Sequence, residues 1–509
     1  MGNPVLAAFS RSNDSKRTKV ILLLASVISV AGYLFWSQAV YTTGFPLDDA
    51  WIHQTYARNL AESREWFFLP GIRSAGSTSP FYTILLSAGY LVELNPFIWT
   101  FMLGWLCLLG IALTGSAIIK AFEISIPKSG YWIGIFLIFE WHLVWAAVSG
   151  METLLFAWFV LLTLSCTLRK PVNWLVTGIL VGSSVWLRPD GITLLGPIII
   201  AIYFSEIGWK ERLRAICLMS LGVLILVAAY ACFNSWLGGG IIPNTFTAKQ
   251  AEYHELQMVP IWVRFAAQIK MLLVGGGLLL LPGFVFIMYF AIRKKLWVWL
   301  GWILWVFGFL FIFAWRLPVT YQHGRYVVPS MVIYFVMGLI GMSMLAQNQR
   351  SNDMWKRIII KTWIWATALV VAVFWLMGAK AYSQDVAIIE TEMVATAKWI
   401  QQNTPIDSVI AAHDIGAMGY FGNRNLIDLA GLVSPEVIPF MRDQSKLSSY
   451  LSQNEVDYLV VFPGWYPQIT DCRLPLFVTN GNFSLTAGGE NMAVYSWRDS
   501  NDISDKCQN

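Results

Sequence analysis

The stretch Phe45-Pro46-Leu47-Asp48-Asp49-Ala50-Trp51-Ile52-His53 begins a few residues after the first long apolar run of the chain, Val20 to Val40. Two adjacent carboxylates beside a membrane-spanning segment are costly unless they bind a ligand or take part in chemistry. Capping of a helix that starts near Ala50 would explain one of them, because Asp is favourable at a helix start. A cap needs only one acid, so the pair predicts a site at the membrane surface.

The composition is that of a polytopic membrane protein. Of the 509 residues, 57% are hydrophobic and only 13% are charged, whereas soluble proteins carry roughly 25% charged residues. The net charge of +5 is small and is divided among several connections, which indicates membrane orientation rather than nucleic-acid binding. The first apolar run is long enough to cross a bilayer and no small-residue cleavage site stands out, so we expect no cleavable signal peptide.

The basic residues set the expected topology. The apolar segment from Phe81 to Leu94 has 14 residues, or about 21 Å of helix, whereas a crossing needs about 30 Å. If this segment does not cross, the N-terminus and all the basic connections face the cytosol, as the positive-inside rule requires. These connections are Lys120/Lys128, Arg169-Lys170, Lys210/Arg212/Arg214, Arg293-Lys294-Lys295 and Arg350/Lys356/Arg357. We therefore expect a half-inserted or surface helix at Phe81–Leu94.

This choice gives about 11 transmembrane helices. They are expected near residues 20–40, 97–119, 131–148, 151–168, 172–187, 191–209, 215–236, 271–292, 296–315, 326–347 and 358–378. Residues 1–379 then form a transmembrane catalytic domain, in which residues 41–96 are the first outer loop with surface helices. The topology also collects several polar segments outside, and their gathering on one face predicts one site. These segments are Asp48-Asp49, Ser149–Thr153, Arg188–Gly191, Pro243–Lys249 and Gln322–Tyr326.

Residues 380–509 are expected to form an α/β domain of about 130 residues, within the usual size range of a domain. Its predicted elements are a helix at Glu390–Gln402 and strands at Ser408–Ala412, Asp457–Phe462 and Asn491–Trp497. An odd number of spans after a cytosolic start makes this domain extracytoplasmic. Cys472 and Cys507 lie in it, and a disulfide between them is left open.

Several outer residues are candidates for substrate binding. His53 follows Asp49 by about one helical turn, Arg58 lies a further turn and a half along, and Glu152 and Asp190 lie at the ends of predicted spans. Each also has a structural explanation: His53 as a packed or surface histidine, Glu152 as a helix-start acid, and Asp190 as a partner of Arg188. The residues alone leave both explanations open.

Four potential cations lie in the outer segments, where positive charge is otherwise scarce. They are Arg188, Lys249, His323 and Arg325. Anionic lipid headgroups would explain any one of them, but several cations near an acidic centre favour a phosphate-bearing substrate. The planar guanidinium of an Arg matches phosphate geometry particularly well.

The motifs also occur in a recognisable order. The acidic pair is followed by Ser149-Gly-Met-Glu-Thr, Arg188-Pro-Asp-Gly, Pro243-Asn-Thr-x-x-Ala-Lys, His323-Gly-Arg-Tyr-x-x-Pro, and Asp414-Ile-Gly-Ala-Met-Gly-Tyr with Ile427-Asp-Leu-Ala-Gly-Leu. From about Phe45 to Leu432 this order resembles the GT-C superfamily of polyprenyl-phosphate-sugar-dependent glycosyltransferases. Within it, the order is most similar to the bacterial branch that includes a terminal arabinofuranosyltransferase of the mycobacterial cell wall.

The resemblance implies an inverting transfer of a hexose or pentose from a polyprenyl-phosphate donor, on the outer face of the cell membrane and without a nucleotide. The acceptor would be a cell-envelope glycan, a glycolipid or a protein. The family's catalytic base corresponds to the Asp48-Asp49 pair, with Asp48 favoured as base, Asp49 as acceptor or metal ligand, and the reverse assignment open. Arg188, Lys249, His323 or Arg325 would hold the donor phosphate, and Glu152 matches a second acidic position.

Three further expectations accompany this interpretation. Metal use varies in the superfamily, so a divalent cation such as Mg²⁺ or Mn²⁺ is left open, with Asp49 and Glu152 as its ligands if one is present. No Trp-Trp-Asp signature is seen, which argues against protein N-glycosylation. The lipid tail of the donor would enter sideways from the bilayer, with Phe81–Leu94 as part of the entrance.

Two other classes of protein compete with the enzyme interpretation. A secondary transporter or flippase would use Asp48, Glu152 and Arg188 as a polar translocation path. Transporters place such charges near the middle of spans and often have related halves, whereas here the acids lie at span ends and the halves look unrelated. A noncatalytic receptor would bind carbohydrate through residues 380–509 without transferring a sugar.

Overall fold

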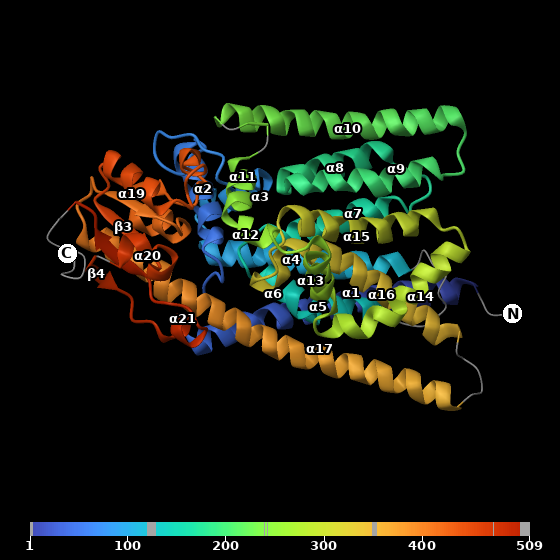
Figure 1. Ribbon diagram of the computed structural model, residues 1–509. Helices are drawn as coiled ribbons and strands as arrows, with labels where there is room; N and C mark the ends of the chain where they lie inside the picture. The colour runs from blue at the N-terminus through green and yellow to red at the C-terminus, as the bar shows by residue number, and fades with distance from the viewer. Residues whose placement is uncertain are drawn as a thin grey trace.

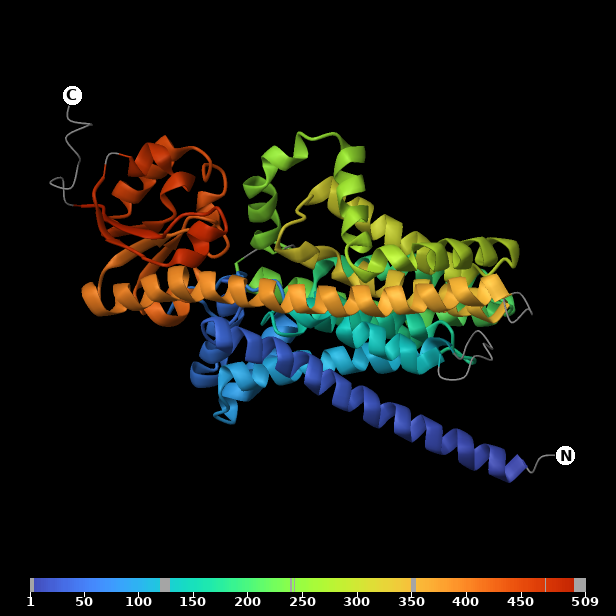
Figure 2. The same ribbon diagram turned by 90° about the horizontal axis from the view of Figure 1, so that it is seen from below.

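A bundle of long helices forms most of the molecule, and a small sheet domain lies at one end of it (Figure 1). The computed structural model describes residues 4–119, 129–238, 240–241, 243–348, 354–471 and 473–498. The start of α1 (Pro4–Val40) lies at the end of the bundle away from the sheet domain, as expected for an odd number of crossings (Figure 2). The predicted pair Cys472 and Cys507 lies outside the described residues.

Within the described ranges, seven helices are long and apolar enough to cross a membrane. They are α1, α4 (Pro96–Ile118), α10 (Trp209–Trp236), α14 (Gly276–Arg293), α15 (Trp297–Arg316), α16 (Val328–Asn348) and α17 (Met354–Ile389). An eighth span consists of α5 (Ser129–Phe139) and α6 (Trp141–Ala147), bent by 62°. At the bend the Glu140 carboxylate caps α6 by accepting from the Leu143 N–H, which explains how a polar residue interrupts this span.

The remaining predicted spans are shorter apolar helices. They are α7 (Thr153–Cys166), α8 (Trp174–Leu187) and α9 (Leu195–Tyr203), the last preceded by the turn η2 (Pro189–Leu194). Each predicted span therefore coincides with a helix or a helix pair, and the polytopic α-helical fold is confirmed. The helix predicted at Phe81–Leu94 is α3 (Pro80–Leu91), whose 12 residues reach only about 18 Å.

Helix α2 (Asp49–Ser63) leads out of the acidic pair. The capping explanation is wrong for Asp48, because its side chain makes no hydrogen bond to the start of this helix. Three more outer helices connect α10 to α14: α11 (Asn244–Glu252), α12 (His254–Gln257) and α13 (Ile261–Leu273). Figure 1 places α2, α11 and α12 at the end of the bundle that faces the sheet domain.

The C-terminal domain is joined to the bundle by a continuous helix. The predicted boundary at residue 380 falls inside α17, which continues to Ile389 and is followed by the turn η4 (Glu390–Val394) and α18 (Ala395–Asn403). The helix predicted at Glu390–Gln402 corresponds to these last two elements.

A five-stranded mixed sheet in the order β2-β1-β3-β5-β4 forms the core of this domain. Strand β1 (Val409–Ala412) pairs in parallel with β2 (Asn425–Asp428) and β3 (Tyr458–Val461), while β5 (Ala493–Ser496) is antiparallel to β3 and β4 (Pro475–Val478). The predicted strands correspond to β1, β3 and β5. Strands β2 and β4 were not predicted, because these edge strands are less buried than β1, β3 and β5 and so lack a continuous apolar run: polar residues bound it in β2 and a proline interrupts it in β4.

Candidate active site

Asp49 lies between two cations that come from distant parts of the chain. Arg325 Nη2 donates to Asp49 Oδ2 at 2.5 Å, and Lys249 Nζ lies 3.5 Å from the same oxygen. Both cations also donate to the Tyr326 hydroxyl, at 3.0 and 3.1 Å. Lys249 is supplied by α11, and Arg325 and Tyr326 by the turn η3 (Gln322–Val327) between α15 and α16.

The guanidinium of Arg325 is only partly satisfied. Its side chain is 5% exposed, yet its Nε and Nη1 atoms have no hydrogen-bond partner within the described part of the chain. Buried polar groups are almost always hydrogen-bonded, so such orphaned donors call for an explanation. Donors left unpaired on a buried guanidinium can donate charge-assisted hydrogen bonds to an oxyanion.

Asp48 is used differently from its neighbour. Its two carboxylate oxygens accept the backbone N–H groups of Gly416 and Ala417, at 2.6 and 2.8 Å, and so attach the C-terminal domain to α2. A Cβ on residue 416 would lie 2.0 Å from the Asp48 carbonyl oxygen, so this close approach requires glycine. The Asp48 side chain is buried, whereas that of Asp49 is 29% exposed.

The pKa values of the two acids are shifted in opposite directions. Burial, followed by repulsion from the Asp414 carboxylate, raises the pKa of Asp48 to about 8, against the lowering effect of the two backbone N–H groups. Burial also raises the pKa of Asp49, but attraction to Lys249 and Arg325 outweighs it and holds that pKa well below its ordinary value. Asp49 is therefore the member of the pair that is ionised at neutral pH.

Two cavities meet at the acidic pair. The first, which we call the apolar cavity, measures about 620 Å³ and is lined mainly by apolar side chains of α6, α13 and α17. These include Trp141, Trp145, Met271, Val274, Ile388 and Ile389. The second, the polar cavity, measures about 740 Å³ and lies between α11 and the C-terminal domain. Asp48, Asp49, Tyr321, Gln322, Asp414 and Trp465 line both.

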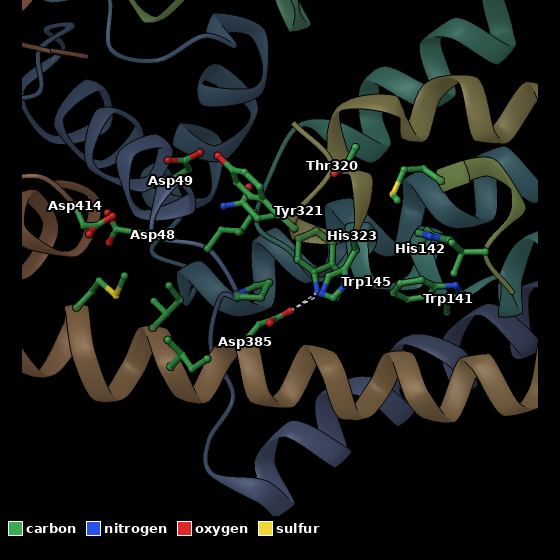
Figure 3. Close-up of a pocket in the computed structure, with 18 of the residues that line it drawn as sticks. Asp48, Asp49, Trp141, His142, Trp145, Thr320, Tyr321, His323, Asp385 and Asp414 are labelled. Atoms are coloured by element: carbon green, nitrogen blue, oxygen red, sulfur yellow. Dashed lines mark hydrogen bonds and ion pairs between the residues drawn. The ribbon is translucent and has the colours of Figure 1, made fainter. Parts of the chain in front are cut away.

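A histidine-carboxylate pair lies in the apolar cavity. His323 Nε2 is 2.8 Å from Asp385 Oδ2, and Trp145 Nε1 donates to the same oxygen at 2.9 Å (Figure 3). Trp141 and Trp145 contact the edge of the His323 ring. Asp385 was not predicted as a site residue, although it lies only two turns beyond the predicted end of its span. An acidic residue just beyond the end of an apolar span was the signal in the sequence that could have identified it.

A second charged cluster lies away from both cavities. His53 Nε2 is 3.4 Å from Glu152 Oε2, Arg188 Nη1 is 3.8 Å from Glu152 Oε1, and Arg188 Nη2 is 3.1 Å from Asp190 Oδ2. His53 is also bonded to Ser77, at 3.1 Å. Burial raises the pKa of Glu152, but His53 and Arg188 outweigh it and lower that pKa to about 2.

The predicted site residues are thus divided between several places. The structure brings residues of the five segments close together at one end of the bundle, but only Lys249 and Arg325 reach Asp49, while His323 lies in the apolar cavity. The Arg188 guanidinium lies 5.5 Å from the centre of the Tyr326 ring. Through this tyrosine the Glu152 cluster adjoins the residues around Asp49. Arg58 stacks on Tyr420 at 4.3 Å and donates to its carbonyl, which joins α2 to the C-terminal domain.

Two further predictions concern elements outside the cavities. Residues of α3 line neither cavity in the described structure, so the expected role of Phe81–Leu94 in the donor entrance is not supported by the cavity walls. Among the described residues no three His, Cys, Asp or Glu side chains are grouped as metal ligands. Asp49 and Glu152 are each paired with different cations, so they do not form a preformed ligand set.

The polar cavity also contains residues that the sequence analysis did not assign to the site. His413 Nδ1 is 2.7 Å from the Tyr466 hydroxyl, and His413 Nε2 is 3.7 Å from Glu252 Oε1. Asp414 lies beside them, and its buried Oδ2 has no hydrogen-bond partner among the described residues. Two features of the sequence could have indicated these residues. Glu252 follows Lys249, the last residue of one motif, by one helical turn, and Asp414 begins another motif just after β1.

Parts of this chain are similar to known proteins. A family described as a domain of unknown function (DUF8728) matches residues 381–495. No curated protein shows detectable sequence similarity. The crystal structure of ArnT from Cupriavidus metallidurans bound to undecaprenyl phosphate is similar with a TM-score of 0.57 and 13% identity, covering 94% of this chain and 98% of that one. Archaeal oligosaccharyltransferase AglB from Archaeoglobus fulgidus, in complex with an inhibitory peptide and a dolichol-phosphate, gives 0.60 and 11%, covering 88% and 69%.

At these identities the likeness establishes the fold. The chain is a multi-pass membrane protein with a small C-terminal α/β domain, and its fold is similar to those of ArnT and AglB. The fold that the resemblance in the motifs implies is confirmed. The arabinofuranosyltransferase-like branch stays a prediction.

Proposed function

We propose that this protein is an inverting glycosyltransferase that uses a polyprenyl-phosphate sugar as donor at the outer membrane face. One observation carries the proposal: Arg325, buried and with two unpaired donors, lies with Lys249 beside Asp49 where the apolar and polar cavities meet. The two solved structures named above, which share the fold, hold undecaprenyl phosphate and dolichol-phosphate. A guanidinium with unpaired donors, bonded to an acid that lines both the polar and the apolar cavity, suits a lipid-linked phosphate.

The donor phosphate is held by Arg325 and Lys249. An unpaired N–H of Arg325, at Nη1 or Nε, donates to a phosphate oxygen, and Lys249 contributes a second positive charge. The first part of the lipid tail lies in the apolar cavity, along the side chains of α6, α13 and α17. Stabilised by these cations, polyprenyl phosphate is a good leaving group, so no general acid is required.

Asp49 is the general base, which reverses the assignment favoured from the sequence. It lines both cavities, and its Oδ1 has no hydrogen-bond partner among the described residues, whereas both oxygens of Asp48 accept backbone N–H groups. When the donor phosphate binds Lys249 and Arg325, it competes with Asp49 for their charge. This competition raises the pKa of Asp49 and makes it a stronger base only when the donor is present.

The reaction balances with these groups alone. An acceptor hydroxyl in the polar cavity attacks the anomeric carbon from the face opposite the phosphate, and Asp49 takes the hydroxyl proton. The new bond joins the acceptor oxygen to the anomeric carbon while the bond from that carbon to the phosphate oxygen breaks. Polyprenyl phosphate leaves as an anion paired with Lys249 and Arg325, and the configuration at the anomeric carbon is inverted.

A transfer assay tests this proposal. The purified full-length protein is supplied with a panel of polyprenyl-phosphate hexoses and pentoses and with cell-envelope glycan, glycolipid and protein fractions. We expect one donor to release polyprenyl phosphate together with a glycosylated product of inverted configuration. No release with any donor, or full activity in both Asp48→Asn and Asp49→Asn, would refute it.

The orientation of the chain is part of the same proposal. A cytosolic N-terminus and an extracytoplasmic C-terminal domain place the acidic pair on the outer face. The exposed residues Ser63 and Ser445 are suitable positions for single cysteines. Both should react with a membrane-impermeant maleimide added from outside, and protection of either one in intact cells contradicts the topology.

A further inference from the structure

The polar cavity continues outward into an open groove of about 710 Å³. The cavity and the groove share Glu255, Met441, Arg442 and Gln444. One wall is formed by α11 and α12, and the other by the segment from Ile438 to Lys446 of the C-terminal domain. Figures 1 and 2 both show the outer helices next to this domain. The site beside Asp49 is therefore the inner end of a long channel.

Arg442 joins the two walls where the cavity opens into the groove. Its guanidinium donates to the backbone carbonyl of Glu252 at the end of α11. The Glu252 carboxylate in turn faces His413 of the C-terminal domain, 3.7 Å from its Nε2. A ligand that extends from Asp49 into the groove must pass Arg442, which is exposed and so free to change its conformation.

The charges along the channel are mixed. The acids are Asp48, Asp49, Glu252, Glu255, Asp414 and Asp443, and the basic residues are Lys249, His254, Arg325, His413, Arg442 and Lys446. A strongly anionic or strongly cationic polymer would meet as many repulsive as attractive groups on this path. The lining therefore favours an uncharged, polar ligand.

Aromatic and unpaired polar groups line the channel near Asp49. Trp465 and Tyr321 are 51% and 43% exposed, which leaves ring faces free beside the acid. Buried Oε1 of Gln322 and Oδ2 of Asp414 have no hydrogen-bond partner within the described ranges. Flat apolar faces next to unpaired hydrogen-bond acceptors match a sugar ring, which has apolar C–H faces and hydroxyl donors at its edge.

We propose that the acceptor is a neutral oligosaccharide chain bound along this channel. Its terminal sugar lies against Trp465 with a hydroxyl at Asp49, and the following sugars pass Arg442 into the groove between α12 and the Ile438–Lys446 segment. A small acceptor would use only the cavity, whereas the continuous groove provides contacts for several sugars. The inference rests on the proposed transferase function and specifies its acceptor.

Binding of a length series tests the inference without requiring turnover. The ligands are neutral envelope-glycan fragments of one to six sugars, prepared from the organism that makes this protein and tagged with a fluorophore. They are titrated with the full-length protein in nanodiscs with no donor present, and binding is measured by fluorescence anisotropy. We expect the affinity to rise at least about tenfold from one to four sugars, a change of about 1.4 kcal/mol. Arg442→Ala should remove most of this rise, whereas Trp465→Ala should weaken the binding of every fragment, the single sugar included.

Matched variants separate the groove from general effects. Arg498→Ala removes an exposed arginine of the same domain that pairs with Glu455 and Asp457 and lines neither the cavity nor the groove, so it should keep the wild-type length dependence. Trp465→Phe keeps an aromatic ring and should retain most of the affinity. Because Arg442 and Trp465 are exposed, all four variants should unfold at the wild-type temperature.

Three results would overturn the inference: affinity that does not depend on length, alanine variants indistinguishable from Arg498→Ala, or preferential binding of a peptide series run in parallel. The assay contains no donor, so its outcome is independent of the reaction. Length-dependent binding without sugar transfer counts against the proposed function alone. Transfer with length-independent binding counts against the extended acceptor alone.

Discussion

The cluster around Asp49 and the cluster around Glu152 contain the same kinds of side chain at the same end of the helix bundle. Each has a carboxylate paired with an arginine, Arg325 in one and Arg188 in the other. They differ in what remains unpaired and in what they face. Arg325 has two unpaired donors and lines the polar cavity, whereas Arg188 bonds Asp190 and packs among aromatic rings. The unpaired atoms of the second cluster are carboxylate oxygens, Glu152 Oε2 and Asp190 Oδ2, and they line neither cavity.

This difference shows that charge near a membrane boundary does not by itself mark a site. In the Glu152 cluster the charges neutralise one another within the helix packing, which is how a buried ion pair avoids a large desolvation cost. In the Asp49 cluster two cations converge on one carboxylate oxygen and leave hydrogen-bonding capacity free beside a cavity. A free donor at a cavity is the feature that indicates a ligand.

The largest expected effect is that of Asp49→Asn on turnover. A positioned general base contributes about 10²- to 10⁴-fold to a rate, so we expect a loss of this size in sugar transfer with little change in unfolding temperature. Asp48→Asn should cause a smaller loss, because it weakens domain attachment rather than proton transfer. A larger loss for Asp48→Asn than for Asp49→Asn would show that Asp48 is the base.

Arg188→Met should act on stability rather than on the donor site. It leaves the buried Glu152 with only His53 and the partly exposed Asp190 without its cation, and breaking a buried pair in this way costs about 3 kcal/mol or more. Thermal unfolding of the purified protein measures this loss, and the fraction that remains folded should keep its affinity for undecaprenyl phosphate. Normal stability with weakened lipid binding would place Arg188 in the donor site and remove the distinction between the clusters.

Arg325→Gln should have the opposite profile. It removes the positive charge and the guanidinium N–H donors that bind the phosphate. We therefore expect undecaprenyl phosphate to bind about 30-fold more weakly, equivalent to about 2 kcal/mol. Binding by native mass spectrometry or by competition with a labelled lipid measures the change, and Lys249→Gln should show the same trend. Unchanged lipid affinity in both variants contradicts their assignment to the donor phosphate.

A further prediction concerns pH. Since the pKa of Asp48 is raised to about 8 in the folded protein, the folded state keeps a proton that the unfolded state releases near pH 4. Stability should therefore fall as the pH rises from 5 to 8. Asp48→Asn has no proton to lose and should flatten this slope, although Asp414 and His413, whose pKa values are also raised, retain part of it. An unchanged slope contradicts the prediction.

Much of the bundle could be predicted because each span is a long apolar run whose basic flanks fix its direction. Hydropathy and charge are local properties and can be read directly. The bend at Glu140 was missed because a capping carboxylate inside an apolar run resembles an isolated polar residue. Strands β2 and β4 were missed because each lies at a sheet edge, where a polar residue or an exposed proline interrupts its apolar run.

The candidate site was predictable in its location but not in its pairings. The sequence predicted Asp49, Lys249 and Arg325 on one face, yet it could not distinguish Arg325 from Arg188, since both are arginines in polar segments beside predicted spans. The contact of Asp48 with Gly416 joins residues 368 positions apart. Only the packing of the C-terminal domain on α2 reveals which carboxylate is occupied and which remains free.

The most direct test of the central claim is a cryo-EM structure of the full-length protein with undecaprenyl phosphate. The account predicts that the phosphate lies within hydrogen-bond distance of Lys249 Nζ and of Arg325 Nε or Nη1, beside Asp49, with the lipid tail entering the cavity lined by Trp141 and Trp145. A phosphate bound at Arg188, or elsewhere with Arg325 and Asp49 still paired as they are here, would contradict it.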